Sequence, residues 1–172
     1  MMGKIRTFRE LFEMELRYAY DCEQKLVKKG LTSMIEAATS PELRSGLQQH
    51  LEERRGHVAR LERVFSSLAL DPDAKSNGVI DELTKAAKDS VSNLDDGALR
   101  DAALIFNGNY VEHYEIAMYG VLVEFARRLG IEEAATLFQQ TLNEEKAADA
   151  KLTQLAQRIN PRAAVQAQHA TA

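Results

Sequence analysis

Two glutamates stand close together in an otherwise apolar stretch of the sequence, YVEHYEIAMYG at residues 110–120. Glu112 and Glu115 are one helical turn apart, so in a helix they would project from nearly the same face. A carboxylate that is removed from water costs several kcal/mol unless it is paired, protonated or bound to a metal. The pair therefore indicates that something inside the fold neutralises two negative charges.

Acids also lie on or beside the apolar faces of the other long helical patterns, when residues are placed about 100° apart around an ideal helix. Glu23 lies near the middle of the first apolar face, and Glu145 lies at the centre of the fourth with Asp149 beside it. Glu53 lies at the edge of the second face. Acids that converge from four helices repel one another unless a cation neutralises them. The set favours a metal site, and ion pairs with a core-edge base such as Arg54 remain the alternative.

Two histidines extend this set on the second helical pattern. His50 and His57 lie inside its apolar arc, and with Glu53 they share one side of the helix at positions i, i+7 and i+3. A single such residue more often lies at the edge of a bundle, where its tip reaches water. Only the set as a whole favours a metal site.

Helical segments must position these residues, and their boundaries follow from caps, glycines and prolines. Thr7 with Glu10 reads as a capping box at the first start, and Ser40-Pro41 reads as an N-cap followed by proline at the second. Gly30 is a candidate stop, after which the helix can resume through LTSMIEAA. The four long patterns predicted in this way cover about 7–30, about 40–68, about 98–129 and about 131–159.

Between the second and third patterns, residues 69–97 are rich in Asp, Ser, Asn and Gly around one amphipathic piece, VIDELTKAAKDSV. This composition predicts a crossover that carries a short helix. No alternating strand pattern occurs, so the predicted fold class is all-α. It is a ferritin-like four-helix bundle with one long crossover. We expect residues 1–160 to form the bundle, Asn160-Pro161 to end its last helix, and residues 161–172 to form a disordered tail.

The bulk composition limits the classes of function. The chain has 172 residues and a formal net charge of -4, which provides no basic surface for nucleic acid or an anionic membrane. No signal-peptide pattern or spanning apolar run is present, and Cys22 is the only cysteine. A cytoplasmic protein is the expectation. The broad apolar arc of the third pattern, together with the crossover helix, predicts a homodimer.

Four segments carry a family resemblance: LRYAYDCEQKL, HLEERRGHVARLE, VEHYEIAMYG and TLNEEKAADAKL. In order and spacing they resemble the signature segments of the YciE/YciF family of ferritin-like proteins, over about residues 8–156. More distantly, EHYEIAMYGVLVEFARRLGIEEAATLF with NEEKAADAKL is similar to the second helical hairpin of rubrerythrins. The resemblance implies two iron or manganese ions, held by one Glu on each of two helices and Glu-x-x-His on the other two.

Residue by residue, the resemblance implies Glu23 as the ligand of the first helix and Glu53 as the bridging acid of the second. It implies Glu112, with Glu115 one turn on, as the ligands of the third helix and Glu145 as the bridge of the fourth.

The sequence departs from the expected pattern at both histidines. Gly56 and Ala148 stand three residues after the two bridging acids. His57 and Asp149 follow at the next positions and are the expected replacements, either as direct ligands or as partners of ligands. A site with more carboxylate tolerates manganese or magnesium as well as iron.

The leading functional hypothesis is a carboxylate-bridged dinuclear metal protein with a role in stress and with redox chemistry linked to O2 or peroxide. Whether it is an enzyme stays open, with an oxidase or a peroxidase-like reaction as the candidates. Because the chain has no C-x-x-C pair, redox turnover would need an external electron donor. The alternative is a non-catalytic helical bundle that acts through self-association or protein binding, with a structural ion or no metal.

Overall fold

The computed structural model describes residues 4–95 and 97–169, and every regular element among them is helical. The all-α class is therefore confirmed. In chain order the elements are α1 (Phe8–Lys25), one π-helical turn (Leu26–Gly30), α2 (Leu31–Ala37), α3 (Pro41–Ser67), α4 (Gly78–Ser92), α5 (Ala98–Arg128) and α6 (Glu132–His169).

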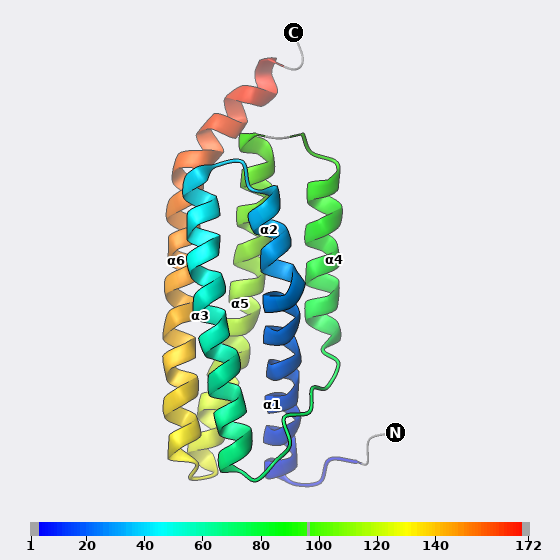
Figure 1. The fold of residues 1–172 in the computed structure, drawn as a ribbon, viewed down its shortest axis with the longest axis vertical. Coiled ribbons are helices and arrows are strands. Elements are labelled where there is room, and N and C mark those ends of the chain that lie inside the picture. Colours follow the sequence, from blue (N-terminus) through cyan, green and yellow to red (C-terminus); the bar gives the residue numbers. More distant parts are fainter. Residues whose placement is uncertain (1–3, 96, 170–172) are drawn as a thin grey trace.

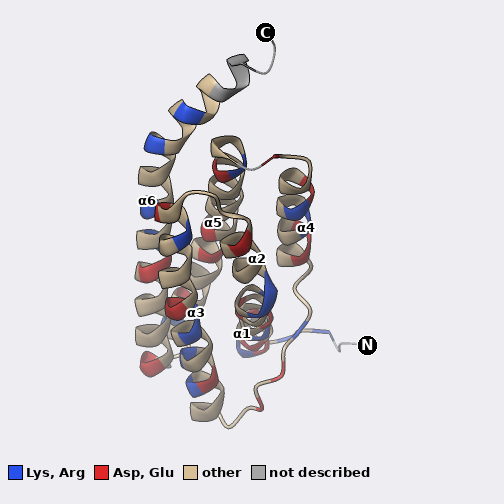
Figure 2. Ribbon diagram, turned by 45° about the horizontal axis from the view of Figure 1, so that its top comes forward, with Lys and Arg blue, Asp and Glu red and all other residues tan. Residues whose placement is uncertain are grey.

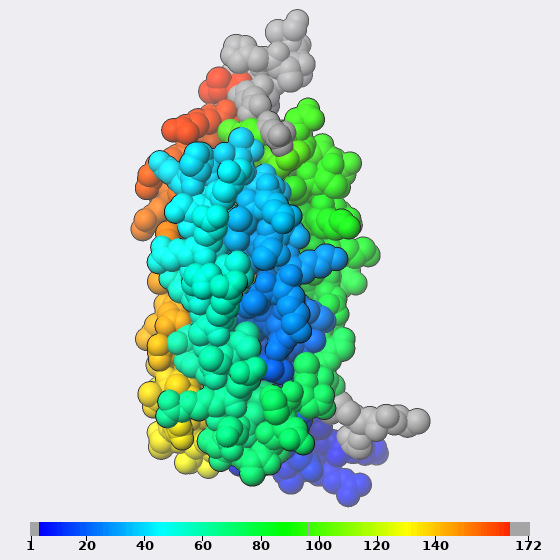
Figure 3. Space-filling model, in the orientation of Figure 1, coloured from blue at the N-terminus to red at the C-terminus, as the bar shows by residue number. Residues whose placement is uncertain are grey.

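Four long helical rods form the bundle. The first rod consists of α1, the π-helical turn and α2 in line, and α3, α5 and α6 run alongside it (Figure 1). In the space-filling view, α3 packs directly against α1 and α2 on one face of the molecule (Figure 3). The connection from α3 to α5 carries α4, which packs against α5. The arrangement is the predicted bundle with one long crossover and a short extra helix.

Side-chain caps start α1, α3 and α4, and the caps of α1 and α3 are those predicted from the sequence. Thr7 and Glu10 form a capping box, in which the Thr7 hydroxyl accepts from the Glu10 amide and the Glu10 carboxylate accepts from the Thr7 amide. Ser40 caps α3 ahead of Pro41, and the Asn77 side chain accepts from two amides at the start of α4. Each cap satisfies amides that have no partner within the helix.

The first rod continues through Gly30 instead of stopping there. The amide of Leu26 is shared between the carbonyls of Cys22 and Glu23, and one wider turn follows before the α-helix resumes at Leu31. A Cβ atom at Gly30 would lie only 2.9 Å from Leu26 Cδ2. The glycine therefore allows close packing within the turn. The sequence alone makes Gly30 a candidate end of the helix.

The last helix runs beyond its predicted end at Asn160-Pro161. Pro161 lies inside α6, which continues to His169 and extends past the end of the bundle (Figure 1). Proline removes one helical hydrogen bond, but Ile159 before it and Ala163 after it are both buried. This packing holds the helix across the proline. The segment expected to be a disordered tail is thus helical as far as His169, and residues 170–172 lie outside the described residues.

Two apolar clusters form the core, one toward each end of the bundle. Along α3 the first includes Leu61 and Phe65, and the second includes Leu43 and Leu47. Along α6 they include Phe138 and Leu142, and Leu152 and Leu155, respectively. On both helices, the segment between the two clusters carries buried charged residues.

The outer faces are charged. Acidic and basic residues are interspersed along the helices, without a face of one sign in this view (Figure 2). No helix in the described part of the chain is both long enough and apolar enough to cross a membrane.

Candidate metal centre

A group of ionisable side chains is buried at mid-length of the bundle, between the two apolar clusters. All four rods contribute to this group, which we call the buried charged cluster. Its members are Glu23 of α1, His50, Arg54 and His57 of α3, Glu112 and Glu115 of α5, and Glu145 of α6.

Helical spacing brings these side chains to the interior. His50, Arg54 and His57 follow one another at four and three residues on α3, and Glu112 and Glu115 are one turn apart on α5. Residues at these spacings lie on one side of a helix. The side chains of all five are less than a tenth exposed.

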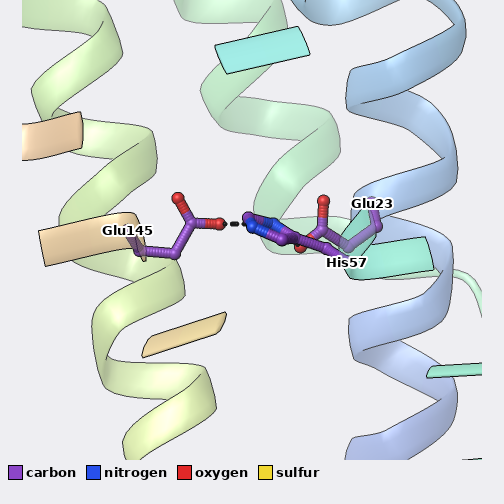
Figure 4. Close-up of side chains that lie close together, drawn as sticks. All are labelled: Glu23, His57 and Glu145. Atoms are coloured by element: carbon purple, nitrogen blue, oxygen red, sulfur yellow. Dashed lines mark hydrogen bonds and ion pairs between the residues drawn. The ribbon is translucent and has the colours of Figure 1, made fainter. Parts of the chain in front are cut away.

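One triad within the cluster joins α1, α3 and α6. His57 Nδ1 lies 3.0 Å from Glu23 Oε1 and 3.1 Å from Glu145 Oε1, and the two carboxylates approach the imidazole from opposite sides (Figure 4). Tyr119 donates from its hydroxyl to the same Glu23 oxygen at 2.7 Å. Glu23 is therefore held from two directions.

A second triad joins α3, α5 and α6. His50 Nε2 lies 3.2 Å from Glu112 Oε1 and 3.6 Å from Glu145 Oε2. Neither approach has the alignment of a hydrogen bond, and His50 Nε2, Glu112 Oε2 and both oxygens of Glu145 have no hydrogen-bond partner among the described residues. Glu145 belongs to both triads.

A carboxylate at the edge of the bundle contacts the outward ring nitrogen of each histidine. Glu144 lies 2.9 Å from His57 Nε2 and also pairs with Arg60. Glu53 lies 3.2 Å from His50 Nδ1. In both cases the outer carboxylate takes one ring nitrogen and leaves the other directed into the cluster, which is how outer partners orient metal-binding histidines.

Arg54 occupies the middle of the cluster and is 1% exposed. Its two terminal nitrogens donate to the two oxygens of Glu115 at 2.7 and 2.6 Å. They also donate to Glu23 at 3.2 Å and to Glu112 at 3.1 Å, and Glu145 lies 3.6 Å away. One guanidinium thus faces all four buried carboxylates.

The charges of the cluster shift its pKa values. Burial opposes the protonated form of His57, but the carboxylates of Glu23 and Glu144 raise its pKa to about 12. Burial and Arg54 likewise oppose protonation of His50, while Glu112 and Glu53 raise its pKa to about 9. In the absence of a metal ion, both imidazoles are therefore protonated at neutral pH.

The buried carboxyl groups respond in different directions. Burial raises the pKa of Glu115 well above its usual range, against the opposing effect of Arg54. Burial acts in the same direction on Glu112, but the charge of Arg54 and the nearby His50 lower its pKa to about 2. The positive charges of Arg54 and His50 thus outweigh burial at Glu112, whereas Arg54 does not outweigh burial at Glu115.

The donor atoms of both triads are spaced nearly as the ligands of one metal ion are. Bonds from transition metals to nitrogen and oxygen are about 2.0–2.2 Å long, so two ligands of one ion lie at most about 4.4 Å apart. In each triad one ligand atom from each residue lies within 4.8 Å of the others. Shifts of a few tenths of an ångström would bring either set to coordination distance. The mixed imidazole and carboxylate donors suit iron or manganese.

The structure brings together five of the predicted ligands and keeps two apart. Glu23, His57, Glu112, Glu115 and Glu145 all belong to the buried charged cluster, although both oxygens of Glu115 accept from the central arginine.

Glu53 and Asp149 lie outside the cluster. The Glu53 side chain is 36% exposed and contacts the outer side of His50 and Gln49, so it does not bridge the two triads. Asp149 accepts from Asn109 at 2.6 Å and lies 3.3 Å from the exposed His113. Both residues lie at the margin of their apolar arcs, where a small rotation of the helix turns a side chain outward.

Two central residues were not assigned as ligands, because the sequence left the role of His50 open and offered Arg54 as an ion-pair partner. His50 and Arg54 lie inside the apolar arc of α3, and this placement is the signal that could have included them. Arg54 stands three residues before His57, where the Glu-x-x-His pattern has its glutamate. The charge at that position is therefore inverted.

A pocket lies beside His50, one residue of the second triad. It has a volume of about 110 Å³ between α3 and α6, and His50 and Glu53 are among its lining residues. Small residues, Gly46, Ala147 and Ala148, form part of its wall. His50 is therefore the member of the buried charged cluster that lines this pocket.

Comparison with known proteins places the chain in a family. Residues 7–165 match the model of a domain of unknown function, DUF892. The chain is 35% identical to Protein YciF of Escherichia coli K12 over 153 residues, which is 88% of this chain and 92% of YciF.

Solved structures agree with this match. The crystal structure of the E. coli stress protein YciF has a TM-score of 0.87 at 34% identity and covers 91% of this chain and 99% of its own. YcfI of Rhodopseudomonas palustris, for which a structural role has been suggested, has a TM-score of 0.85 at 39% identity, with coverages of 89% and 97%. A protein of Xanthomonas campestris, XCC3681, shares the fold at a TM-score of 0.76 and 23% identity, with coverages of 94% and 99%. The chain therefore belongs to the YciF-like family that the DUF892 model describes.

Proposed function

We propose that this chain is a ferritin-like metal protein that holds divalent iron or manganese in the buried charged cluster. The observation that supports this most directly is the set of buried polar atoms without hydrogen-bond partners. His50 Nε2, Glu112 Oε2 and both oxygens of Glu145 point into the same region. Buried polar atoms are almost always satisfied in native proteins, so these four unpaired ligand-type atoms favour an ion, although the fifth unpaired atom of the cluster, Arg54 Nε, is a donor that cannot bind one.

Bound iron or manganese would supply one-electron redox chemistry with O2 or peroxide, which suits the stress association of the E. coli relative. The chain's own residues prepare the site. Glu144 and Glu53 fix the orientation of the two histidines, and Tyr119 holds Glu23 by a hydrogen bond. The apolar clusters on both sides keep bulk water away, which strengthens every electrostatic interaction between them.

A second candidate is a structural bundle without metal. The observation that favours it is the position of Arg54, which with the two protonated imidazoles offsets most of the negative charge of the four buried carboxylates. The structural role suggested for the relative from R. palustris agrees with this candidate. Self-association would then be its mode of action.

Metal analysis separates the two candidates. Protein purified without chelator, and then dialysed against Mn²⁺ and passed through a desalting column, should retain metal if the first proposal is right. Glu145→Gln should abolish retention, because both triads share this residue. Glu124→Gln, at an exposed position of α5, is the matched control and should retain the metal of the wild type. Absence of bound metal in the wild type under all these conditions would favour the structural bundle.

A further inference from the structure

Arg54 is a permanent positive charge at the place where a dinuclear centre would have its ions. Its guanidinium lies within 3.6 Å of a carboxylate oxygen from each of Glu23, Glu112, Glu115 and Glu145. Guanidinium groups do not lose their proton in proteins. With 1% exposure and hydrogen bonds to three of these acids, Arg54 has no short route to the solvent.

The charge of the cluster then limits how many metal ions it can hold. Two divalent ions with neutral imidazole ligands would neutralise four carboxylates. With Arg54 present and His57 protonated, one divalent ion brings the cluster to a net charge of about 0 when all four acids are ionised, and a second ion, which would need His57 neutral as a ligand, brings it to about +1. A second ion would also be repelled by the first and by the guanidinium at close range, in surroundings of low dielectric constant.

The two triads are not equally free to receive that ion. In the first triad, Glu23 Oε1 already accepts hydrogen bonds from Tyr119 and His57. In the second, His50 Nε2, Glu112 Oε2 and Glu145 Oε2 are all buried and without a hydrogen-bond partner. His50 of the second triad also lines the pocket between α3 and α6, whereas no residue of the first triad does.

We propose that Arg54 takes the place of one of the two metal ions, so that the cluster binds a single divalent ion at His50, Glu112 and Glu145. This inference rests on the proposed function and specifies its stoichiometry and position. His57 and Glu23, with Arg54, form the hydrogen-bonded half of the cluster, and Glu115 is the bidentate partner of Arg54 rather than a ligand.

Equilibrium dialysis of metal-free protein against Mn²⁺, with metal measured by mass spectrometry, tests the stoichiometry. The wild type should bind one ion per chain, and Arg54→Met should bind two, because its four carboxylates then require two divalent ions. Arg55→Met, on the exposed side of α3, is the matched control and should bind one. Two ions on the wild type, or one on Arg54→Met, would overturn the inference.

Two further measurements keep the test decisive if Arg54→Met does not fold. His50→Gln should lose the ion of the wild type, whereas His57→Gln should keep it, and the reverse result would contradict the position. The electron paramagnetic resonance spectrum of the Mn²⁺-loaded wild type should show the hyperfine pattern of an isolated ion. The broadened signal of a coupled pair would contradict a single ion.

These outcomes also distinguish the inference from the proposed function. If the wild type binds two ions, the proposed function stands and the role of Arg54 is wrong. If the wild type binds none and Arg54→Met binds two, the site exists but Arg54 excludes both ions, which again overturns the single-ion inference. If neither protein binds metal, the proposed function itself fails.

Discussion

Two carboxylates at the edge of the bundle, Glu53 and Glu144, have similar relations to the two buried histidines. Each lies within 3.2 Å of the outward ring nitrogen of one histidine and leaves the inward nitrogen directed at the cluster. They differ in support, because Glu144 also pairs with Arg60 whereas Glu53 is 36% exposed. We therefore expect Glu53 and Glu144 to strengthen metal binding by holding the two imidazoles in a fixed orientation.

Replacement of Glu53 should weaken metal binding without removing it. Glu53→Ala leaves the three atoms of the second triad in place but frees the His50 ring, and the loss of such an outer partner costs about 10- to 100-fold in metal affinity. Titration with Mn²⁺ in a competition assay measures this change. Glu52→Ala, an exposed neighbour on α3, should leave the affinity unchanged. Complete loss of metal from Glu53→Ala would instead support Glu53 as a direct ligand.

The stability of the metal-free protein should fall as the pH rises above neutrality. The folded-state pKa of His50 is raised from 6.5 to about 9, so its protonation stabilises the fold fully below pH 6.5. This contribution is lost as the pH rises through about 9, and it amounts to at most about 3 kcal/mol at about 1.4 kcal/mol per pKa unit. Thermal unfolding in the presence of chelator, from pH 6.5 to 9, measures it.

Metal should reduce this dependence, because an ion at His50 replaces the proton and binds more tightly as the pH rises. The increase in Tm on addition of Mn²⁺ is therefore expected to be larger at pH 8 than at pH 6. An equal increase at both values would argue against an imidazole ligand. On the acid side, the lowered pKa of Glu112, about 2, adds stability that is present above pH 4.5 and is lost as the pH falls through about 2.

At the scale of elements, a buried carboxylate connects the start of α5 to the turn before α3. Asp101 is 3% exposed and accepts hydrogen bonds at 2.7 Å from the backbone amides of both Thr39 and Ser40. The amide of Gly97 donates to the Thr39 hydroxyl at 3.1 Å in the same region. These bonds set the relative height of α3 and α5, on which five members of the buried charged cluster are carried.

Asp101→Ala should lower the stability of the bundle. Two hydrogen bonds to a charged acceptor are lost and two amides lose their partner, so we expect a decrease of about 3 kcal/mol in the free energy of unfolding. Urea unfolding of the metal-free protein measures the change. Asp89→Ala, at an exposed position of α4, should change the free energy by no more than about 0.5 kcal/mol. A similar small effect of both substitutions would contradict the role of Asp101.

At the scale of the whole molecule, an apolar stripe lies exposed along α5. Leu99, Phe106, Tyr110 and Val121 fall within a narrow arc of this helix and are 40–59% exposed. The rings of Phe106 and Tyr110 pack against each other with centroids 5.7 Å apart. Exposed apolar residues that share one face of a helix often mark an interface, so we propose that two chains meet along this stripe.

The wild type should therefore have about twice the mass of one 19.2 kDa chain in solution. The double variant Phe106→Lys with Tyr110→Lys should return the mass of a single chain, because it places charges in the centre of the stripe. Light scattering coupled to gel filtration at micromolar concentration measures both. Val165→Lys, at an exposed apolar position of α6, is the control and should remain dimeric. A single-chain mass for the wild type would refute the dimer.

Much of the fold follows from local sequence. Caps at Thr7 and Ser40 predict the starts of α1 and α3, and the crossover composition and the helical periodicity of apolar residues predict the bundle plan. The end of α6 could not be predicted in this way. Pro161 is a local helix breaker, but the burial of residues on both sides of it, which depends on tertiary packing, overrides that preference.

The candidate site divides in the same way. The sequence by itself determined that acids from three helices meet inside the bundle, because 3.6-residue periodicity places Glu23, Glu112 and Glu145 on apolar faces, whereas the acid expected from α3, Glu53, lies outside. Only the tertiary structure decided that the side chain of Arg54 lies among these acids. Arg54 and Glu53 are adjacent on α3, and a rotation of that helix by about 100° would exchange their places. Packing against the three neighbouring rods sets this rotation, so it turns the arginine inward and the glutamate outward.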